Sequence, residues 1–468
     1  MKKYIYLFSI FFSLYFANAQ QVQWASKVIK FTSDLGGKQF GIKRILGKPD
    51  VFPQGGYSGN AWTPKNALDG REIIIVGYEK PQTVKQVAVF ENLNAGCVTR
   101  IFISTDGEKF DAVWSRKPDY KTPRYKTTLI TDRSYYFKRK RRKVEEIPDV
   151  FNPGIEYAIL DNAVSNVVAV KVEFSFALLP GQKQIDAIGI SDSEISIDAK
   201  INTSAVFDTL PNPEAINFDK EIFNCLLSND GQQLYFTVTE NDKDAVYLCQ
   251  KEANNKWSTP IAQAVLNDNE RYNYIEYSNA DFMIKGGIPY TINSGVSGFE
   301  FIDKNGTKEP IKITAFSNYE DTADLTITAD KKQLILAINT DFTQGGTDLY
   351  FTTRKEDGTY GLLQNMGKSI NSANDESTPQ LLSDTKTLLF SSTGYSSFGD
   401  HDIYIAYRLD DTWKNWSEPV NLGAKINGAE FDGSPYYDEK SEILYYIKSI
   451  EGKTFLNWIK IPKASIFK

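Results

Sequence analysis

The feature of this sequence that most constrains its fold is an internal repeat that fills the second half of the chain, from about residue 201 to Lys468. Three segments align without gaps, and each joins a polar turn to an apolar strand: 227–236, 327–336 and 381–390. Weaker copies around Asp281 and Asp438 bring the number to five units of about 50 to 56 residues. The apolar positions alternate as they do in strands, and one such unit cannot bury its apolar face alone. We therefore expect a β-propeller of five or six blades.

Aspartates recur at equivalent places in these units, which favours a scaffold role. Asp230, Asp330 and Asp384 stand in polar turns, where an aspartate bonds to the backbone of its own turn. Asp348 and Asp402 each begin a strand-like segment and are expected to anchor the adjacent turn. Catalytic acids would instead be unique to one blade, because a glycosidase needs two carboxylates in a single pocket.

The first half of the chain predicts a β-sandwich. Its strand-like segments, separated by turn signals, are 72–78, 84–90, 98–103, 167–174 and 185–190. The 26 Tyr and 29 Phe, against 3 Met, agree, because aromatic rings pack well on pleated sheets. The two halves together predict an all-β protein, with a jelly-roll β-sandwich at residues 20–198 followed by a β-propeller at residues 199–468.

Residues 1–19 are typical of a signal peptide, with a basic start, an apolar run over 4–16 and the small-x-small pattern Ala17-Asn18-Ala19. We expect the mature chain to begin at Gln20. No later apolar stretch approaches the ~18 residues that mark a membrane-spanning helix. We therefore expect an exported protein without a transmembrane span, located in the periplasm, peripherally at the outer membrane, or outside the cell.

Charge and the supply of reactive side chains exclude several functions. With 53 Lys and Arg against 59 Asp and Glu, the net charge is -6, so no basic field draws the chain to nucleic acid. The chain has one histidine, His401, and three cysteines, Cys97, Cys225 and Cys249. A zinc site needs three or four His or Cys ligands brought together, and a Ser-His-Asp triad needs a histidine beside its nucleophile, so neither kind of site is expected. We expect a protein that is not an enzyme, has no required cofactor, and has thiols that are free or paired at most once.

Several motifs of the first half, in order and spacing, resemble the discoidin, or galactose-binding-like, jelly roll. They are Ala67-Leu68-Asp69-Gly70, the segment 103–110, the Val-rich strand 167–174 and Ile185-Asp186-Ala187-Ile188, and the resemblance covers roughly residues 55–192. It implies binding of sugars, lipids or proteins through loops at one end of the sandwich, often beside a structural calcium near the Asp-Gly loop.

Three residues of this region are candidate site residues. Asp69 offers a carboxylate to a calcium ion, and Tyr57 and Trp62, in a Gly-rich segment, offer aromatic faces to a sugar ring. The alternative is that Trp62 fills the edge of the core and Asp69 makes a turn.

One dense charge run, Lys138-Arg139-Lys140-Arg141-Arg142-Lys143, lies between the sandwich strands. Adjacent like charges repel each other and resist burial, so the run is expected to be a solvated loop. The alternative is a patch that binds anionic envelope polymers or an acidic protein.

The repeats resemble the PD40, or WD40-like, propellers related to TolB. The motifs are the S-x-D-G-like turn, the L-Y-F strand, and the G-x-x-D-I-Y, W-x-x-P and N-L-G-x-x-I-N patterns. Ahead of them, the segments 23–29, 45–49 and 61–64 resemble the N-terminal part of OmpA-family envelope proteins of Bacteroidetes-type bacteria. Those proteins continue into a peptidoglycan-binding domain, whereas the given chain ends at Lys468, so that activity is not carried over.

These observations favour an exported cell-envelope protein that binds or scaffolds and does not catalyse. Its expected partners are envelope glycans or envelope proteins, engaged through loops of the sandwich and the propeller. The alternative is a secreted propeller glycosidase that uses paired carboxylates.

Overall fold

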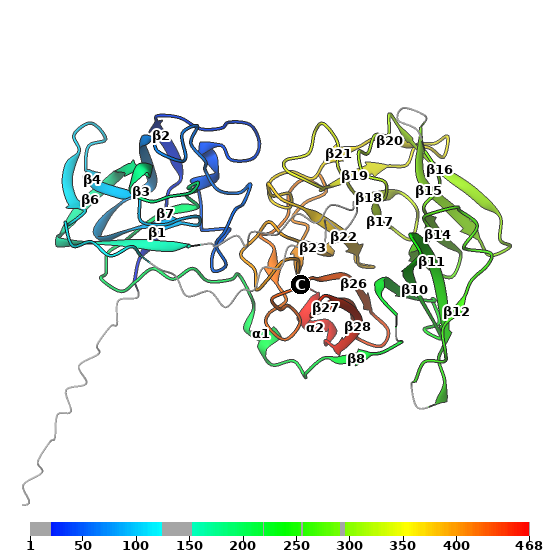
Figure 1. Cartoon of the computed structure of the whole chain (residues 1–468). Coiled ribbons are helices and arrows are strands. Elements are labelled where there is room, and N and C mark those ends of the chain that lie inside the picture. Colours follow the sequence, from blue (N-terminus) through cyan, green and yellow to red (C-terminus); the bar gives the residue numbers. More distant parts are fainter. Residues whose placement is uncertain (1–19, 124–151, 219, 254–255, 291–294, 468) are drawn as a thin grey trace, which may run out of the picture.

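The computed structural model describes residues 20–123, 152–218, 220–253, 256–290 and 295–467. Its regular secondary structure is almost entirely β-strand, and in Figure 1 an N-terminal β-domain lies beside a ring of sheets. The expected signal peptide and the basic run Lys138–Lys143 lie outside the described residues. Within the described residues, no helix has the length and apolar character needed to cross a membrane.

The N-terminal domain is built on one seven-stranded sheet in the order β1-β7-β3-β6-β4-β5, with β2 paired to β3. Its strands are β1 (Val22–Trp24), β2 (Lys27–Phe31), β3 (Arg71–Glu91), β4 (Val98–Ser104), β5 (Asp111–Ser115), β6 (Gly154–Ser175) and β7 (Ala187–Ser191). A large apolar cluster packs against this sheet. The strands confirm the predicted all-β fold of this half.

The two segments predicted at 72–78 and 84–90 form the single long strand β3. Its register against β6 shifts between Gly77 and Gln86, so that the first half of β3 pairs with β2 and the second half with β7. The residues between the halves, Glu79 to Pro81, are exposed. They resemble a turn in the sequence because they are polar and include a proline, yet the chain stays extended through them.

The second half is a β-propeller with five blades arranged in a ring (Figure 1). The strands of each blade are given from the innermost outward. Blades 1 and 2 are β9 (Ile222–Leu227), β10 (Gln233–Glu240), β11 (Lys243–Gln250) and β12 (Ile261–Ala262), and then β13 (Tyr274–Ser278), β14 (Phe282–Gly286), β15 (Val296–Asp303) and β16 (Lys308–Thr314). Blade 3 is β17 (Asp324–Ile327), β18 (Gln333–Ile338), β19 (Asp348–Thr353) and β21 (Gln364–Asn365). Blade 4 is β22 (Glu376–Leu381), β23 (Thr387–Ser392), β24 (Asp402–Tyr407) and β25 (Val420–Asn421). Blade 5 is β26 (Asp432–Asp438), β27 (Ile443–Ile450), β28 (Lys453–Lys460) and β8 (Glu214–Ile216). The predicted propeller is therefore confirmed, with five blades.

Blade 5 combines the two ends of the propeller segment. Strand β8 comes from the beginning of this segment, and it pairs antiparallel with β28 near the C-terminus, from Ile216 opposite Leu456 to Glu214 opposite Trp458. The ring is thus closed by backbone hydrogen bonds between residues far apart in sequence. Two short helices, α1 (Ala205–Asp208) and α2 (Lys463–Ile466), lie near this junction, and both contribute to one apolar cluster.

Neighbouring blades are also joined at their outer edges. Strand β20 (Tyr360–Leu362) belongs to a loop of blade 3 but pairs parallel with β16 of blade 2. The segment that leads into the propeller bonds to the outer strand of blade 4, where the backbone N–H of Asn421 donates to Asn202. Both contacts cover strand edges that would otherwise be open.

Candidate functional site

Trp62 lies in the core of the N-terminal domain. Its side chain is 0% exposed, its ring lies 5.9 Å from the ring of Phe174 and 6.4 Å from that of Phe176, and its indole N–H donates to the carbonyl of Ser33 at 3.0 Å. No face of this ring is open to a sugar. The position corrects the expectation that Trp62 contacts a ligand, and its burial reflects the apolar area that a tryptophan removes from water.

Tyr57 remains accessible. Its side chain is 41% exposed, and its ring lies 5.4 Å from the ring of Phe40 in a tilted arrangement. Tyr57 and Trp62 therefore do not form a joint site, because only the tyrosine offers a surface to solvent.

Asp69 is exposed, and a buried lysine holds the loop that carries it. The Lys183 side chain is 0% exposed, and its Nζ donates to the carbonyls of Leu68 at 3.4 Å, Leu179 at 2.5 Å and Gly181. Among the described residues, no group of three or more His, Cys, Asp or Glu is placed to hold a metal ion. The carbonyl of Leu68, next to Asp69, already accepts a hydrogen bond from the Lys183 ammonium, and a cation at that oxygen would compete with this bond, so the loop does not fit the calcium that the resemblance implies.

The recurring turn aspartates have the predicted scaffold role. Asp230 Oδ1 accepts the hydroxyl of Ser228 at 2.6 Å and the backbone N–H of Gln232 at 3.0 Å. Asp330 and Asp384 accept the equivalent backbone N–H groups in blades 3 and 4. These carboxylates are committed to their own hairpins.

The aspartates that begin β19 and β24 anchor turns, also as predicted. Asp348 Oδ2 accepts the backbone N–H of Gln344 at 2.7 Å and the side-chain amide of Asn365 at 2.6 Å. Asp402 makes the equivalent bonds in blade 4. Burial raises the pKa of Asp348 to about 6 and that of Asp402 to about 7.

At the propeller axis, hydrogen bonds link each innermost strand to the next and form a closed ring around all five blades. The bonds run from Asn224 Nδ2 to Ile275 O (3.4 Å), Leu325 N to Glu276 Oε2 (2.8 Å), Thr378 N to Asp324 Oδ2 (2.9 Å), Ser434 N to Thr378 Oγ1 (3.2 Å) and Ser434 Oγ to Phe223 O (2.6 Å). Thr378 and Ser434 have φ values of 47° and 50°, a conformation uncommon for these residues. The ring uses them to connect blades 3, 4, 5 and 1.

Glu276 and Asp324 are acids of this ring that the repeat analysis did not identify. They lie on the innermost strands of adjacent blades, and neither recurs in the other blades. Burial raises the pKa of both, and the charge of Asp324 raises that of Glu276 further. A sequence signal was present, since blades 4 and 5 place Thr378 and Ser434 at the strand position of Asp324. These two nonrepeated carboxylates on adjacent blades are therefore near enough for the charge of one to act on the other.

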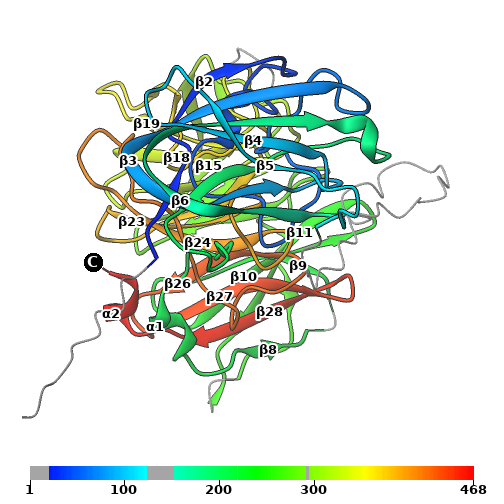
Figure 2. The same ribbon diagram turned by 90° about the vertical axis from the view of Figure 1, so that its left-hand side faces the viewer.

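A buried polar contact joins the N-terminal domain to blades 3 and 4. Asn60 is 1% exposed; its Nδ2 donates to the carbonyl of Gly394 at 2.6 Å, and its Oδ1 accepts the backbone N–H of Ala373 at 2.8 Å. Gln39 donates to the carbonyl of Ala373 at 2.8 Å. Figure 2 shows the N-terminal domain lying across one side of the propeller. We call this contact, between residues 38–60 and the loops of blades 3 and 4, the interdomain seam.

Charge is complementary across the seam. Lys48 lies 3.3 Å from Glu418, and Lys38 donates to the carbonyl of Asp341 at 2.9 Å. Burial lowers the pKa of Arg44, an effect opposed by nearby carboxylates that include Asp50 and Glu376. The basic groups come from the N-terminal domain and most of the acidic ones from the propeller.

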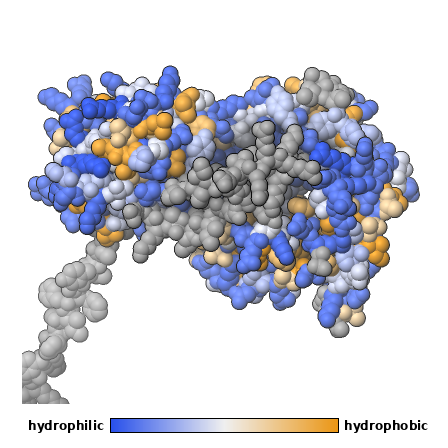
Figure 3. Space-filling view, in the orientation of Figure 1, coloured by the Kyte–Doolittle hydropathy of each residue, from blue (hydrophilic) through white to orange (hydrophobic). Residues whose placement is uncertain are grey.

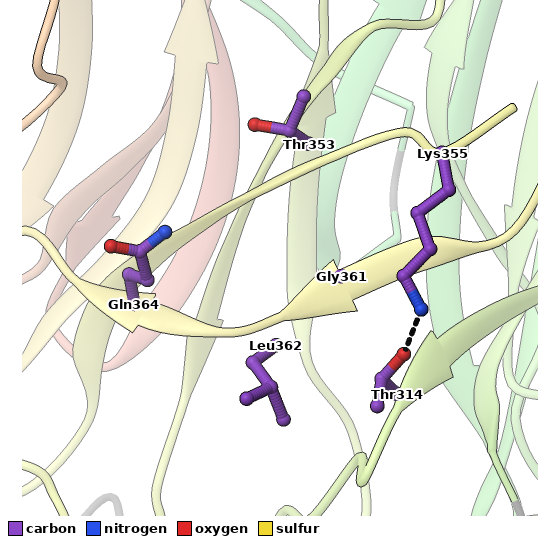
Figure 4. Close-up of a pocket in the computed structure, with 6 residues that line it drawn as sticks. All are labelled: Thr314, Thr353, Lys355, Gly361, Leu362 and Gln364. Atoms are coloured by element: carbon purple, nitrogen blue, oxygen red, sulfur yellow. Dashed lines mark hydrogen bonds between the residues drawn. The ribbon is translucent and has the colours of Figure 1, made fainter.

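The described residues of the propeller line a recess and a groove. A recess of 520 Å³ between blades 2 and 3 is lined by six residues, and in it Lys355 Nζ donates to Thr314 Oγ1 at 2.7 Å (Figure 4). A larger groove of 730 Å³ lies between blades 1 and 2. On the face shown in Figure 3, the apolar residues form small groups among hydrophilic ones.

No protein-family model matches the chain, and no curated protein matches it. Among solved structures, the endo-arabinase from Bacteroides thetaiotaomicron is 16% identical, covers 54% of this chain and 98% of its own, and has a TM-score of 0.35. TolB from Acinetobacter baumannii is 12% identical over 51% of this chain and 54% of its own, with a TM-score of 0.33. The α-L-arabinofuranosidase from Lactobacillus brevis is 12% identical over 57% of this chain and 98% of its own, with a TM-score of 0.34. These likenesses concern the fold alone.

The fold and the sites define a class: this chain is a five-bladed β-propeller joined through a buried polar seam to an N-terminal β-domain. Its conspicuous repeated acids belong to turns, and its nonrepeated axial acids bond to neighbouring blades.

Proposed function

We propose that this protein is a non-catalytic binding or scaffold protein of the cell envelope. The observation that supports this most is the use of its acids. Turn aspartates such as Asp230 accept backbone N–H groups of their own hairpins, and Glu276 and Asp324 accept those of the next blade. The seam adds to this support, because it fixes two β-domains in one arrangement that presents loops of both to a partner.

The finer parts of this proposal come from the sequence. We propose that the chain is exported with removal of residues 1–19, that its N-terminal domain is galactose-binding-like, and that it is related to OmpA-family envelope proteins. It then engages envelope glycans or proteins from the periplasm, the outer membrane or the outside of the cell. N-terminal sequencing of the exported form should begin at Gln20, and an intact Met1 would contradict export by cleavage.

The binding role is tested with purified full-length protein on a glycan array and against solubilised envelope proteins, together with a screen for hydrolysis. We expect saturable binding to a glycan or an envelope protein and no release of sugars. A protein that binds neither would contradict the proposal, and so would one that hydrolyses a glycan.

A second candidate function, a glycosidase, is favoured by one observation, the nonrepeated carboxylates Glu276 and Asp324. The variants Glu276→Gln and Asp324→Asn keep an oxygen for the backbone bonds and remove the negative charge. If wild type releases sugar and both variants lose that activity, while the exposed control Glu356→Gln retains it, the enzyme is established. Hydrolysis that survives both variants would exclude this pair.

A further inference from the structure

One wall of the groove between blades 1 and 2 is an unusually short hairpin. Three residues, 279–281, connect β13 to β14 in blade 2. Five residues connect the equivalent strands in blade 1 (228–232), blade 3 (328–332) and blade 4 (382–386). This short hairpin and the longer hairpin of blade 1 both line the groove of 730 Å³.

Other blade junctions at this end of the propeller are bridged. Between blades 4 and 5, the backbone N–H of Ser383 donates to Glu439 at 2.7 Å, and between blades 5 and 1, Lys440 donates to the carbonyl of Asn229. Between blades 2 and 3, the ammonium of Lys331 lies 4.2 Å from the ring centre of Phe282. Among the described residues that line the groove, no hydrogen bond links the hairpin of blade 1 to that of blade 2.

The groove has two aromatic residues in its lining, Tyr235 and Phe282, and amide side chains around them. Tyr235 and Met283 pack on the apolar cluster between the two blades, and the Tyr235 hydroxyl donates to Gln233 Oε1 at 2.9 Å, which fixes the ring. The surrounding amide side chains are Asn229, Gln232, Gln250 and Asn279. An aromatic face with nearby amides suits a ligand that has an apolar ring face and many hydroxyl groups.

The charges in the groove are satisfied within the protein. The carboxylate of Asp230 accepts bonds within its hairpin, and that of Asp303 accepts the backbone N–H groups of Asn305 and Thr307, each at 2.8 Å. Asp281 lies 3.6 Å from the ammonium of Lys304. With three carboxylates and one ammonium in its lining, the groove repels an anionic ligand, which favours a neutral sugar over an acidic one.

From this geometry we propose that the groove binds a neutral oligosaccharide, with one sugar ring on Tyr235 and its hydroxyls bonded to Gln250 and Gln232. The inference rests on the proposed binding function and names its ligand class and site. The position of Tyr235 in blade 1 holds an aliphatic residue in other blades, since the equivalent residues of blades 3 and 4 are Ile335 and Leu389. Tyr235→Leu therefore removes the aromatic face while keeping a residue that the repeat accommodates.

The test titrates full-length protein with maltohexaose, cellohexaose and xylohexaose by calorimetry, with polygalacturonate as the anionic comparison. We expect one of the neutral sugars to bind, with affinity at least about tenfold lower in Tyr235→Leu and in Gln250→Ala, a loss of about 1.4 kcal/mol. Ala280→Trp, in the exposed short hairpin, should block the groove without disturbing the core. The matched control is Thr353→Ala, since Thr353 pairs with Gln333 in blade 3 as Gln250 pairs with Gln233 in blade 1.

The outcomes separate this inference from the proposed function. Binding of an envelope protein with no binding of any neutral sugar overturns the groove and keeps the function. Sugar binding unchanged in folded Tyr235→Leu and Ala280→Trp overturns the site, as does preferential binding of polygalacturonate. Hydrolysis of the bound sugar overturns the non-catalytic function. In that case the groove is still supported as the binding site if Tyr235→Leu and Ala280→Trp lose sugar binding.

Discussion

At the scale of single residues, burial separates structural side chains from those open to a ligand. Trp62 was expected at a surface because glycines surround it, but Gly59 instead allows close packing of the two domains: a Cβ there would lie 2.8 Å from the carbonyl of Ala373. The sequence shows that position 59 is a glycine, but it does not show which neighbouring residue leaves no room for a side chain there. Lys183 was equally hidden, because nothing in its local sequence indicates that three carbonyls surround its ammonium.

We predict that Lys183→Met lowers the free energy of unfolding by about 1–3 kcal/mol, since it removes the charged donor from three carbonyls. Thermal unfolding followed by circular dichroism measures this, with the exposed Lys65→Met as control. Wild type should melt at the same temperature with calcium or with EDTA. A calcium-dependent rise in melting temperature would show that the Asp69 loop holds the ion after all.

At the scale of strands, the repeat predicted the blades well and their connections poorly. The turns at Asp230, Asp330 and Asp384 could be predicted because the same residue type makes the same backbone hydrogen bond at the equivalent position of each blade. Strand β8 was not identified because three residues, Glu214–Ile216, after a proline carry no periodic pattern. The hydrogen-bonded ring at the axis was not predicted for a related reason. Its five polar members, which include Asn224, Glu276 and Ser434, differ in residue type from blade to blade, so they form no repeat in the sequence.

We predict that Ser434→Ala costs about 1 kcal/mol of stability, because its hydroxyl makes the bond from blade 5 to blade 1. Urea unfolding provides the measurement. Thr239→Ala removes an exposed hydroxyl in blade 1 and serves as the comparison. Equal stability of both variants would mean that the closing bond of the ring contributes nothing.

At the scale of the whole molecule, the seam makes the two domains one unit. The sequence predicted two domains, residues 20–198 and 199–468, and no motif in it indicated a contact between them. The seam was not predictable, since Gln39 and Asn60 are polar residues whose partners lie more than 300 positions away.

We predict that Gly59→Leu separates the domains, because its side chain would occupy the space of the Ala373 backbone. Small-angle scattering should show a larger radius of gyration, and limited proteolysis should show faster cleavage between the domains. Gly361→Ala is the control, as its Cβ would meet its nearest neighbours at 3.6 Å. An unchanged scattering curve would show that the seam tolerates the insertion.

Stability of the whole protein should fall as pH rises from about 4 to about 7. Burial raises the pKa of Asp50, Glu91, Asp402 and Asp432 to about 7 and that of Asp348 to about 6, from ordinary values near 4. Between these limits the folded state keeps protons that the unfolded state has lost, so rising pH favours unfolding until the folded carboxyls ionise. Melting temperatures across this range measure the effect, and Glu91→Gln should flatten the profile. A melting temperature that increases steadily to pH 8 would contradict it.

The pairing of β8 with β28 sets an order for biosynthesis. Strand β8 is made first, and its partner begins at Lys453, 237 residues after Ile216. The ribosome must therefore synthesise the chain as far as β28 before β8 can pair, and until then blade 5 lacks its outermost strand. The ring can therefore close only after blade 5 has been synthesised, and a chain that terminates before β28 cannot form the closed propeller.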